Sequence, residues 1–91
     1  MNKSELISIM AEKSKLTKKD TEIILKAFIE IVEETLEKKE KVQLVGFGTF
    51  EIRNRAARIG RNPRTHEEIS IPEIIVPVFK AGKELKDKVK K

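Results

Sequence analysis

The chain has 91 residues, with 20 lysines and arginines against 15 aspartates and glutamates, and it contains no cysteine. This length predicts one domain, and the lack of cysteine, of a long apolar run and of a leader-like start predicts a soluble, unexported protein of the reducing cytoplasm. The net charge of +5 favours a polyanionic partner, such as nucleic acid or an anionic membrane surface, although many Lys/Glu-rich domains merely carry a solvated surface.

A first helix is predicted at the start of the chain. Asn2 followed by Glu5 is typical of a capping box, in which the two residues satisfy each other's backbone amides. The helix then runs to about Lys13. Its apolar residues on one face are Leu6, Ile9 and Met10.

The second predicted helix, roughly Lys18 to Lys38, follows another capping pattern formed by Thr17 and Asp20. Its apolar residues cover roughly 200° of the circumference, whereas a helix lying on a single core needs only about 100°. We therefore expect this helix to be covered from two sides. The residues of this arc that we expect in a dimer core are Ile24, Leu25, Phe28, Ile29, Ile31, Val32 and Leu36.

After Glu40 the hydrophobic period changes from 3.6 to 2, which predicts strands. A first strand leads to a glycine-flanked turn in the stretch VGFGTF, and a second strand continues from there into an arginine-rich segment. Residues 68–71 and 74–79 form further extended runs, and Gly82 opens a terminal helix. The predicted order is ααβββα. Three aromatic residues of these strands join the expected dimer core: Phe47, Phe50 and Phe79.

Arginine is confined to one segment. All five arginines fall between Arg53 and Arg64, and no acid interrupts the run from Ile52 to His66. Arginine suits phosphates, base edges and narrow electronegative grooves, so the segment is typical of a recognition surface. Residues from Arg53 to about Ile74 can add little to a core, and a structureless loop of this length is unusual, which predicts an extended hairpin arm. The roughly seventy residues left over are marginal alone, which favours a homodimer.

Pro63 stands at the centre of this arm. A proline has no N–H and a fixed φ, so it packs poorly but makes a good apolar wedge between base steps in a DNA minor groove. Alternatively, Asn62 and Pro63 simply form the turn at the tip of the hairpin. The two interpretations are compatible, because a wedge has to sit at a tip.

The run GFGTFEIRNRAARIGRNPRT, Gly46 to Thr65, resembles the signature of the bacterial HU/IHF family of histone-like DNA-binding proteins. The similarity extends to MNKSELI at the start and to IPEIIVPVFKAGKELKDKVKK at the end, so it covers essentially the whole chain. The signature positions that this sequence meets are Gly46, Phe47, Phe50, Arg55, Arg58, Gly60, Asn62, Pro63 and Thr65.

The resemblance implies an α+β fold: two N-terminal helices, a three-stranded antiparallel sheet with a long β-ribbon arm, and a short C-terminal helix, in an intertwined dimer. It implies that residues 1–91 form one domain. Its parts would be a helical dimerisation base (1–40), saddle strands (41–52 and 75–81), a DNA-binding arm (53–74) and a C-terminal helix (82–91). The implied partners are double-stranded DNA, preferably bent, gapped or flexible, and a second copy of the chain or a related subunit.

Site residues follow from the resemblance and from the arginine cluster. The expected residues of the DNA-binding arm are Arg53, Arg55, Arg58, Arg61, Asn62, Pro63 and Arg64, with Pro63 as the intercalating wedge. The expected contacts to the DNA backbone are Lys3, Gly46, Gly48, Lys80, Gly82, Lys83 and Lys86, where the glycines let backbone amides approach phosphates closely.

Three positions depart from the family pattern. His66 stands where the family usually has glycine, so the tip can be less tightly turned; the simpler interpretation is an exposed loop histidine without a role. Ile59 replaces a common basic residue, which removes one phosphate contact per arm. Ala81 stands where proline often precedes the last helix.

Several alternatives stay open. An HU-like protein is largely indifferent to sequence, whereas an IHF-like subunit prefers particular sites; the closing VPVFKAGKELK and the lack of a tail beyond it favour HU. The first two helices could instead be a helix-turn-helix reader, which the apolar character of the second helix disfavours. A membrane-surface role lacks a Lys/Arg-rich helix face. An enzyme is not expected, and neither is a cofactor or a metal, because paired acids, metal-ligand spacings and a phosphate loop are missing.

Overall fold

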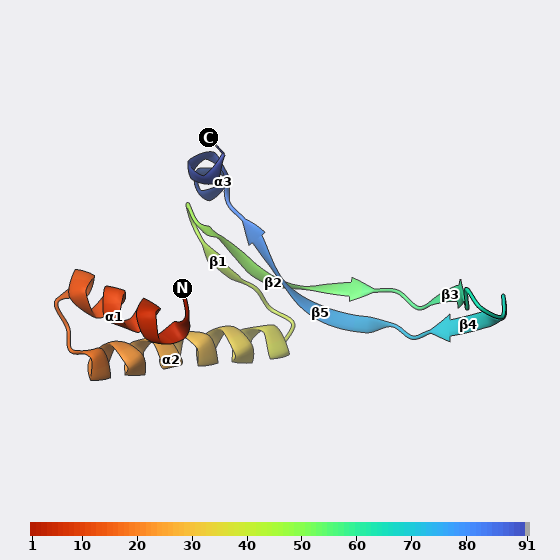
Figure 1. The fold of residues 1–91 in the computed structure, drawn as a ribbon, viewed down its shortest axis with the longest axis horizontal. Coiled ribbons are helices and arrows are strands. Elements are labelled where there is room, and N and C mark those ends of the chain that lie inside the picture. Colours follow the sequence, from red (N-terminus) through yellow and green to blue (C-terminus); the bar gives the residue numbers. More distant parts are fainter. Residues whose placement is uncertain (91) are drawn as a thin grey trace. The chain divides into compact units, whose positions relative to one another are not determined.

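The computed structural model of the protein describes residues 1–90 (Figure 1). Contacts divide the chain into a helical unit, Met1–Glu34, and a sheet unit that begins at Thr35, so the division falls within the second helix. The elements are α1 (Lys3–Ser14), α2 (Lys18–Glu37), β1 (Val42–Leu44), β2 (Gly48–Arg55), β3 (Arg58–Arg61), β4 (Glu68–Ile71), β5 (Ile74–Ala81) and α3 (Lys83–Val89).

The starts of both N-terminal helices are capped as the sequence predicts. The Glu5 N–H donates to Asn2 Oδ1 at 2.8 Å, and the Asp20 N–H donates to Thr17 Oγ1 at 3.1 Å. Each bond satisfies one of the amides that a helix leaves without an internal partner at its first turn. The end of α1 is also ordered, because Lys15 takes a left-handed conformation (φ 58°) and its N–H donates to the Ala11 carbonyl.

The helical unit buries few side chains. Ile7 and Ala11 of α1 are buried, as is Thr21 of α2, whose hydroxyl donates to the Thr17 carbonyl at 2.8 Å. The expected apolar face of α1 is therefore not its buried face: Leu6 and Ile9 remain 38% and 39% exposed. Helix α1 has apolar residues on two sides, and the side chains at 7 and 11, one turn apart, are the pair that packs within this chain.

Much of the apolar arc of α2 stays uncovered in the single chain. Ile24 and Ile31 are 53% and 57% exposed, and Phe28 and Ile29 are more than one-third exposed. In the described part of the chain, no side chain is completely buried. An exposed apolar surface of this kind favours a partner that covers it.

The sheet unit contains an antiparallel three-stranded sheet with strand order β1-β2-β5. Phe50 of β2 stands opposite Val42 on one side and Phe79 on the other. The Phe79 ring lies 4.9 Å from the Phe50 ring and 5.4 Å from the Phe47 ring, centroid to centroid. This aromatic cluster is the main apolar contact of the unit, in the tilted arrangement that aromatic pairs favour.

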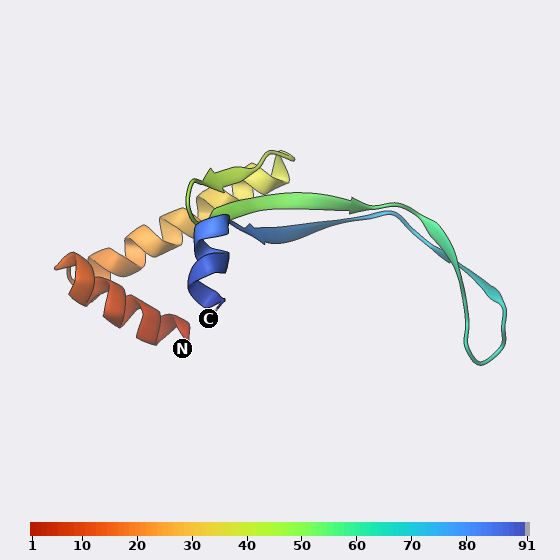
Figure 2. The ribbon, with the colours of Figure 1, turned by 90° about the horizontal axis from the view of Figure 1, so that it is seen from above.

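Beyond Phe50, strand β1 has no further partners, and β2 and β5 continue as a two-stranded ribbon to the pair Arg55 and Ile74. After an interruption, β3 and β4 pair as a separate two-stranded sheet that runs from Arg58 opposite Ile71 to Arg61 opposite Glu68. Figure 2 shows the two segments following each other out to a rounded tip. The structure confirms the predicted α+β class and the expectation of an extended hairpin, although it resolves the expected three strands into five.

The interruption of the arm is symmetric. Ala56 and Ala57 separate β2 from β3, while Pro72 and Glu73 separate β4 from β5. Two residues are left out of the ladder on each side, so the pairing resumes in the same register and no bulge is formed. Pro72 contributes to the interruption, because it has no N–H to donate to a neighbouring strand. The ladder itself runs without a break across residue 53, where we placed the start of the arm.

Candidate nucleic-acid interface

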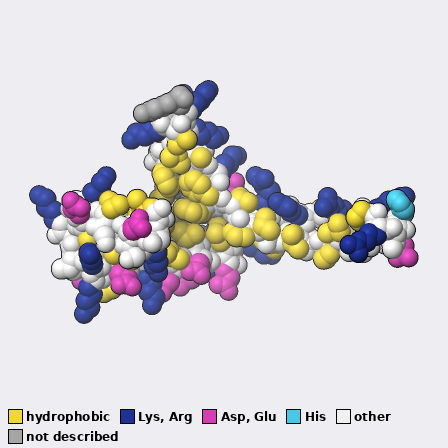
Figure 3. All heavy atoms as spheres, in the orientation of Figure 1, with side chains coloured by type: hydrophobic (Ala, Val, Ile, Leu, Met, Phe, Trp, Pro, Cys, Tyr) yellow, Lys and Arg dark blue, Asp and Glu magenta, His cyan; other side chains and the backbone are white. Residues whose placement is uncertain are grey.

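The arginines predicted for the arm are all exposed and come from three successive segments. Arg53 and Arg55 lie two residues apart on β2 and therefore point to the same face of the ribbon. Arg58 and Arg61 lie three apart on β3 and point to opposite faces. Arg64 lies in the tip. Figure 3 shows Lys and Arg side chains standing out along the arm, which gives the arm permanent positive charge along its length.

The tip of the arm is a hydrogen-bonded turn around Asn62. The Asn62 N–H donates to the Glu67 carbonyl at 2.9 Å, and the His66 N–H donates to the Asn62 carbonyl at 2.8 Å. The Asn62 side-chain oxygen Oδ1 accepts from the Arg64 N–H at 2.9 Å. Asn62 is half-buried between exposed neighbours. The side-chain oxygen of Asn62 thus accepts a hydrogen bond within the turn, as in an Asx-turn.

Pro63 is the first residue of the turn after Asn62 and is exposed. Its two neighbours, Asn62 and Arg64, are joined by the side-chain bond that spans it. Proline has a fixed φ and no backbone N–H. Its insertion into an apolar gap therefore leaves no amide donor without a hydrogen-bond partner. The prediction of a tip turn at Asn62 and Pro63 is confirmed, and the position suits an apolar wedge.

The predicted backbone-contacting lysines lie in both units. Lys80 is at the end of β5, and Lys83 and Lys86, three residues apart, share one face of α3. All three are exposed. They form a basic group at the junction of β5 and α3, where flexible ammonium groups can neutralise phosphates.

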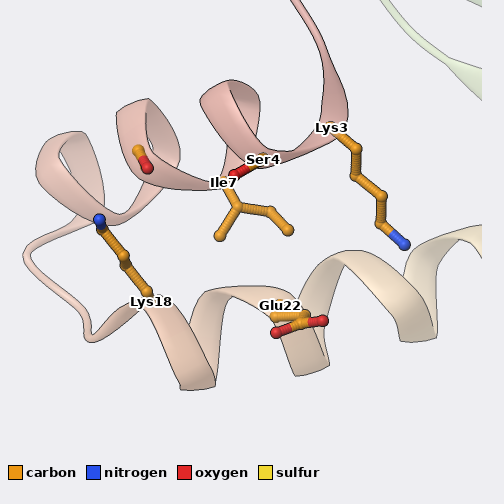
Figure 4. A pocket seen from close by; sticks show the side chains of 6 residues that line it. Lys3, Ser4, Ile7, Lys18 and Glu22 are labelled. Atoms are coloured by element: carbon orange, nitrogen blue, oxygen red, sulfur yellow. The ribbon is translucent and has the colours of Figure 1, made fainter.

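Lys3 belongs to the helical unit, where it lines a recess of about 420 Å³ between α1 and α2. Figure 4 shows Lys3 and Ile7 on α1 and Lys18 and Glu22 on α2 around this recess. Lys18, which we did not assign to the DNA-contacting set, thus joins Lys3 on one surface. The pairing depends on how the two helices pack, and the linear sequence contains no direct signal for it.

The three glycines predicted to approach phosphates have uses within the protein. Gly46 has a φ of 86°, which its turn requires and a side chain would strain. Gly48 is buried; a Cβ there would lie 2.7 Å from both the Lys80 carbonyl oxygen and Phe79 Cε1. The Gly82 N–H donates to the Phe47 carbonyl at 2.8 Å. The left-handed backbone at Gly46 and the close packing at Gly48 account for glycine at these two positions without a ligand.

None of the ten residues expected in a dimer core is buried in the single chain. The seven from α2 are exposed or half-buried, and so are the three phenylalanines of the sheet unit. The Phe47 and Phe79 rings are 46% and 41% exposed although they contact each other. The apolar residues that we assigned to a dimer core thus keep accessible surface.

Within residues 1–90 the structure has no group of three or more His, Cys, Asp or Glu side chains placed to hold a metal ion. Over the same residues, no helix combines the length and the apolar character needed to cross a bilayer.

Comparison with known proteins gives consistent matches. The family model described as bacterial DNA-binding protein matches residues 1–90. The DNA-binding protein HU of Clostridium pasteurianum is 77% identical over 91 residues, covering 100% of both chains, and that of Lactococcus lactis subsp. lactis is 62% identical over 89 residues, covering 98% of each. These relatives are named as DNA-binding proteins, in agreement with the expectation that the chain is not an enzyme.

Solved structures agree with the sequence relatives. A chain of an Anabaena HU–DNA cocrystal structure superposes with a TM-score of 0.89 at 49% identity, covering 99% of this chain and 98% of that one. HU from Thermotoga maritima superposes with a TM-score of 0.72 at 42% identity, covering 99% and 100%. With a family match across the described residues and full-length relatives at this identity, the chain belongs to the bacterial DNA-binding protein family, the HU/IHF family that the stretch Gly46–Thr65 resembles.

Proposed function

We propose that this protein is an HU-like architectural protein that binds the DNA minor groove with little sequence specificity and bends and compacts DNA by inserting Pro63. The observation that carries the proposal is the exposed proline held at the tip of an arm lined with arginines. The Anabaena relative was crystallised with DNA, which supports the same partner here. A protein with this role works at the nucleoid, in the cytoplasm.

Binding would rest on charge. The arm arginines and the lysines at positions 3, 80, 83 and 86 neutralise phosphates and release condensed counterions. Because phosphates carry no sequence information and the minor groove distinguishes little beyond A·T from G·C, such contacts give affinity without strong specificity. Affinity should therefore fall steeply as the salt concentration rises.

Bending would rest on Pro63. Inserting an apolar wedge unstacks a base step at a cost of a few kcal/mol, and the bent duplex then meets more protein surface. DNA that is already gapped or flexible lowers this cost. The protein should consequently prefer such DNA over an intact duplex of the same length.

We further propose that the protein acts as a homodimer. The exposed apolar arc of α2 and the exposed aromatic residues of the sheet unit support this, because a second copy can cover them. Residues 1–40 would then form the dimerisation base, and residues 53–74 of each chain would provide one of two DNA-binding arms. A heterodimer with a related subunit would use the same surface.

The first test compares affinity for two DNA molecules. Fluorescence anisotropy at about 50 mM and about 200 mM salt would measure binding to an intact scrambled duplex and to the same duplex with a short central gap. We expect tighter binding to the gapped DNA and weaker binding to both at higher salt. Equal binding to the two would contradict the proposal, and preference for one particular sequence would favour the IHF-like alternative.

The second test isolates the wedge. We expect Pro63→Ala to reduce the bend angle, measured by energy transfer between dyes at the duplex ends, more than it reduces affinity. Pro72→Ala is the matched control, because it removes a proline from the interruption of the arm rather than from its tip. An unchanged bend angle in Pro63→Ala would rule out intercalation by Pro63, and an equal loss in both variants would point to arm shape instead.

A further inference from the structure

The turn that joins β1 to β2 lies beside the start of α3 within the sheet unit (Figures 1 and 2). The Phe47 N–H donates to the Leu44 carbonyl at 2.9 Å, and Gly46 between them has a φ of 86°, as in a type II turn. The Gly82 N–H donates to the Phe47 carbonyl at 2.8 Å. These bonds hold the start of α3 next to the turn.

The Glu84 side chain covers the backbone of Gly46. A Cβ added at Gly46 would lie 3.0 Å from Glu84 Oε2, 3.4 Å from Cδ and 3.7 Å from Oε1, so the carboxylate already fills the space over this glycine. Glu84 is an exposed residue, so a ligand that approaches the turn meets its charge. The place where we expected a phosphate to approach a glycine therefore carries an anion of the protein itself.

The charges around Glu84 are mostly basic. Lys80, Lys83 and Lys86 are exposed at the junction of β5 and α3, and in the proposed function they neutralise phosphates. The other acid of α3, Asp87, follows Lys83 by one helical turn and can pair with it. Glu84 differs from Asp87 because its carboxylate lies against the turn. A phosphate that is drawn to the lysines meets a like charge there, which is unfavourable.

The turn and the arm tip lie at opposite ends of one stretch of chain. Between Gly48, directly after Phe47, and Asn62, in the tip, the chain runs along β2 and β3. At roughly 3.3 Å per residue this stretch extends up to about 45 Å, which corresponds to about 13 base pairs of DNA at 3.4 Å each. DNA that occupies only the arms can therefore be shorter than DNA that also reaches the turn.

We infer that Glu84 limits the length of DNA that the protein binds tightly. Its carboxylate takes the place of a phosphate at the Gly46 turn and repels the backbone of DNA that reaches the junction of β5 and α3. The gain in affinity from the lysines of this junction is reduced, and binding depends more on the arms. The inference rests on the proposed function, since it requires DNA to extend from the arms to this junction.

The size of the effect follows from counterion release. If loss of the charge at position 84 lets one more phosphate bind at each junction, log affinity falls more steeply with log salt concentration, by about 0.9 for one junction and up to about 1.8 for a dimer. This slope separates an added phosphate contact from a change in protein stability, because a less stable variant releases no additional counterions.

The test compares Glu84→Gln with the original protein on gapped duplexes of about 12 and about 40 base pairs, below and above the length that reaches from the arms to both junctions. Glutamine has nearly the shape of glutamate without its charge, so the packing over Gly46 is retained. Glu40→Gln is the matched control. It makes the same change at an exposed residue of the same unit, at the end of β1 away from the turn.

We expect Glu84→Gln to bind the longer duplex several-fold more tightly than the original protein, with a salt slope steeper by about 0.9 to about 1.8. On the shorter duplex the two proteins should bind alike, and Glu40→Gln should match the original protein on both. Unchanged binding of the longer duplex by Glu84→Gln would overturn the inference. An equal gain on both duplexes, or an equal gain in Glu40→Gln, would also overturn it, because net charge alone would then explain the effect.

Two further variants separate this inference from the proposed function. Lys83→Gln removes a positive charge from the junction, and Arg61→Gln removes one from the arm. If both weaken binding to the longer duplex while Glu84→Gln does not strengthen it, the arm and the junction contact DNA and only the role of Glu84 is wrong. If neither weakens binding, the proposed function fails together with this inference.

Discussion

Asn62 has a structural part in the arm tip in addition to the DNA contact that the sequence predicts for it. Its backbone N–H and carbonyl both bond across the turn, and its side-chain oxygen accepts from Arg64. Each such bond contributes roughly 1 kcal/mol. We therefore propose that Asn62 also positions Pro63.

This role predicts a specific pattern in a double-mutant cycle. Asn62→Ala should reduce the DNA bend angle because the side-chain bond that spans Pro63 is lost. The double variant Asn62→Ala/Pro63→Ala should bend DNA no less than Pro63→Ala alone, since both changes act through the same wedge. The measurement is energy transfer between the duplex ends.

Asn54→Ala provides the matched control for that cycle. Asn54 lies on β2 opposite Ile75, away from the tip turn, so its replacement should leave the bend angle unchanged. Additive losses from Asn62→Ala and Pro63→Ala would show that Asn62 acts on DNA independently of the wedge.

Several residue-level features could be predicted from the sequence because they depend on neighbours along the chain. The caps at Asn2 and Thr17 follow from a spacing of three residues and are confirmed by bonds of 2.8 and 3.1 Å. The buried pair Ile7 and Ala11 was missed. Periodicity shows that α1 has apolar residues on more than one side, and it does not show which side meets α2 within the same chain.

At the scale of elements, the connection between α1 and α2 contains a strained residue. Lys15 holds a left-handed conformation at the end of α1, with its N–H bonded to the Ala11 carbonyl. A residue with a Cβ loses about 1 kcal/mol or more in this conformation relative to glycine. The strain lies in the backbone of Lys15, whose side chain is exposed, so a replacement by glycine can relieve it without loss of buried contacts.

Lys15→Gly should raise the free energy of unfolding by up to about 1 kcal/mol, measured by urea denaturation at a fixed protein concentration. Lys13→Gly is the control, because the same replacement inside α1 should lower the free energy of unfolding by about 1 kcal/mol. A loss of stability in both variants would mean that the flexibility of glycine in the unfolded chain outweighs the strain at position 15.

The existence of the arm could be predicted from the sequence, whereas its division into a β2/β5 ribbon and a separate β3/β4 ribbon could not. A stretch without enough apolar residues for a core, bounded by alternating runs, indicates a hairpin. The interruption between β2 and β3 falls on Ala56 and Ala57, which have no local feature that forbids a strand. Only Pro72, between β4 and β5 on the opposite side of the arm, indicates the interruption. Its position becomes informative only once the pairing of the two sides is known.

At the scale of the whole molecule, the exposed apolar surface leads us to expect that stability depends on assembly. If a second copy covers the apolar arc of α2, the melting temperature should rise with protein concentration, because dissociation and unfolding are then linked. Differential scanning calorimetry over a wide concentration range measures this. A concentration-independent melting temperature would indicate a stable monomer.

Ile24→Glu tests the same surface at one position. Ile24 is 53% exposed in the single chain, so the change should cost the single chain little. In a dimer that buries it, the change should weaken association by at least about 2 kcal/mol, visible as dissociation in sedimentation velocity. Lys26→Glu, on the polar side of α2 and exposed, is the control and should leave the dimer intact.

The ladder of the arm has a consequence for how such a protein can evolve. Beyond the interruption, β3 and β4 pair only with each other, and their side chains are mostly exposed. Substitutions there meet few packing constraints, so they should alter DNA preference without first having to be compatible with a folded core. The distal ribbon can therefore diversify as a nearly independent module, and exchanging residues 58–71 between relatives should transfer binding behaviour while leaving the thermal stability of the recipient nearly unchanged.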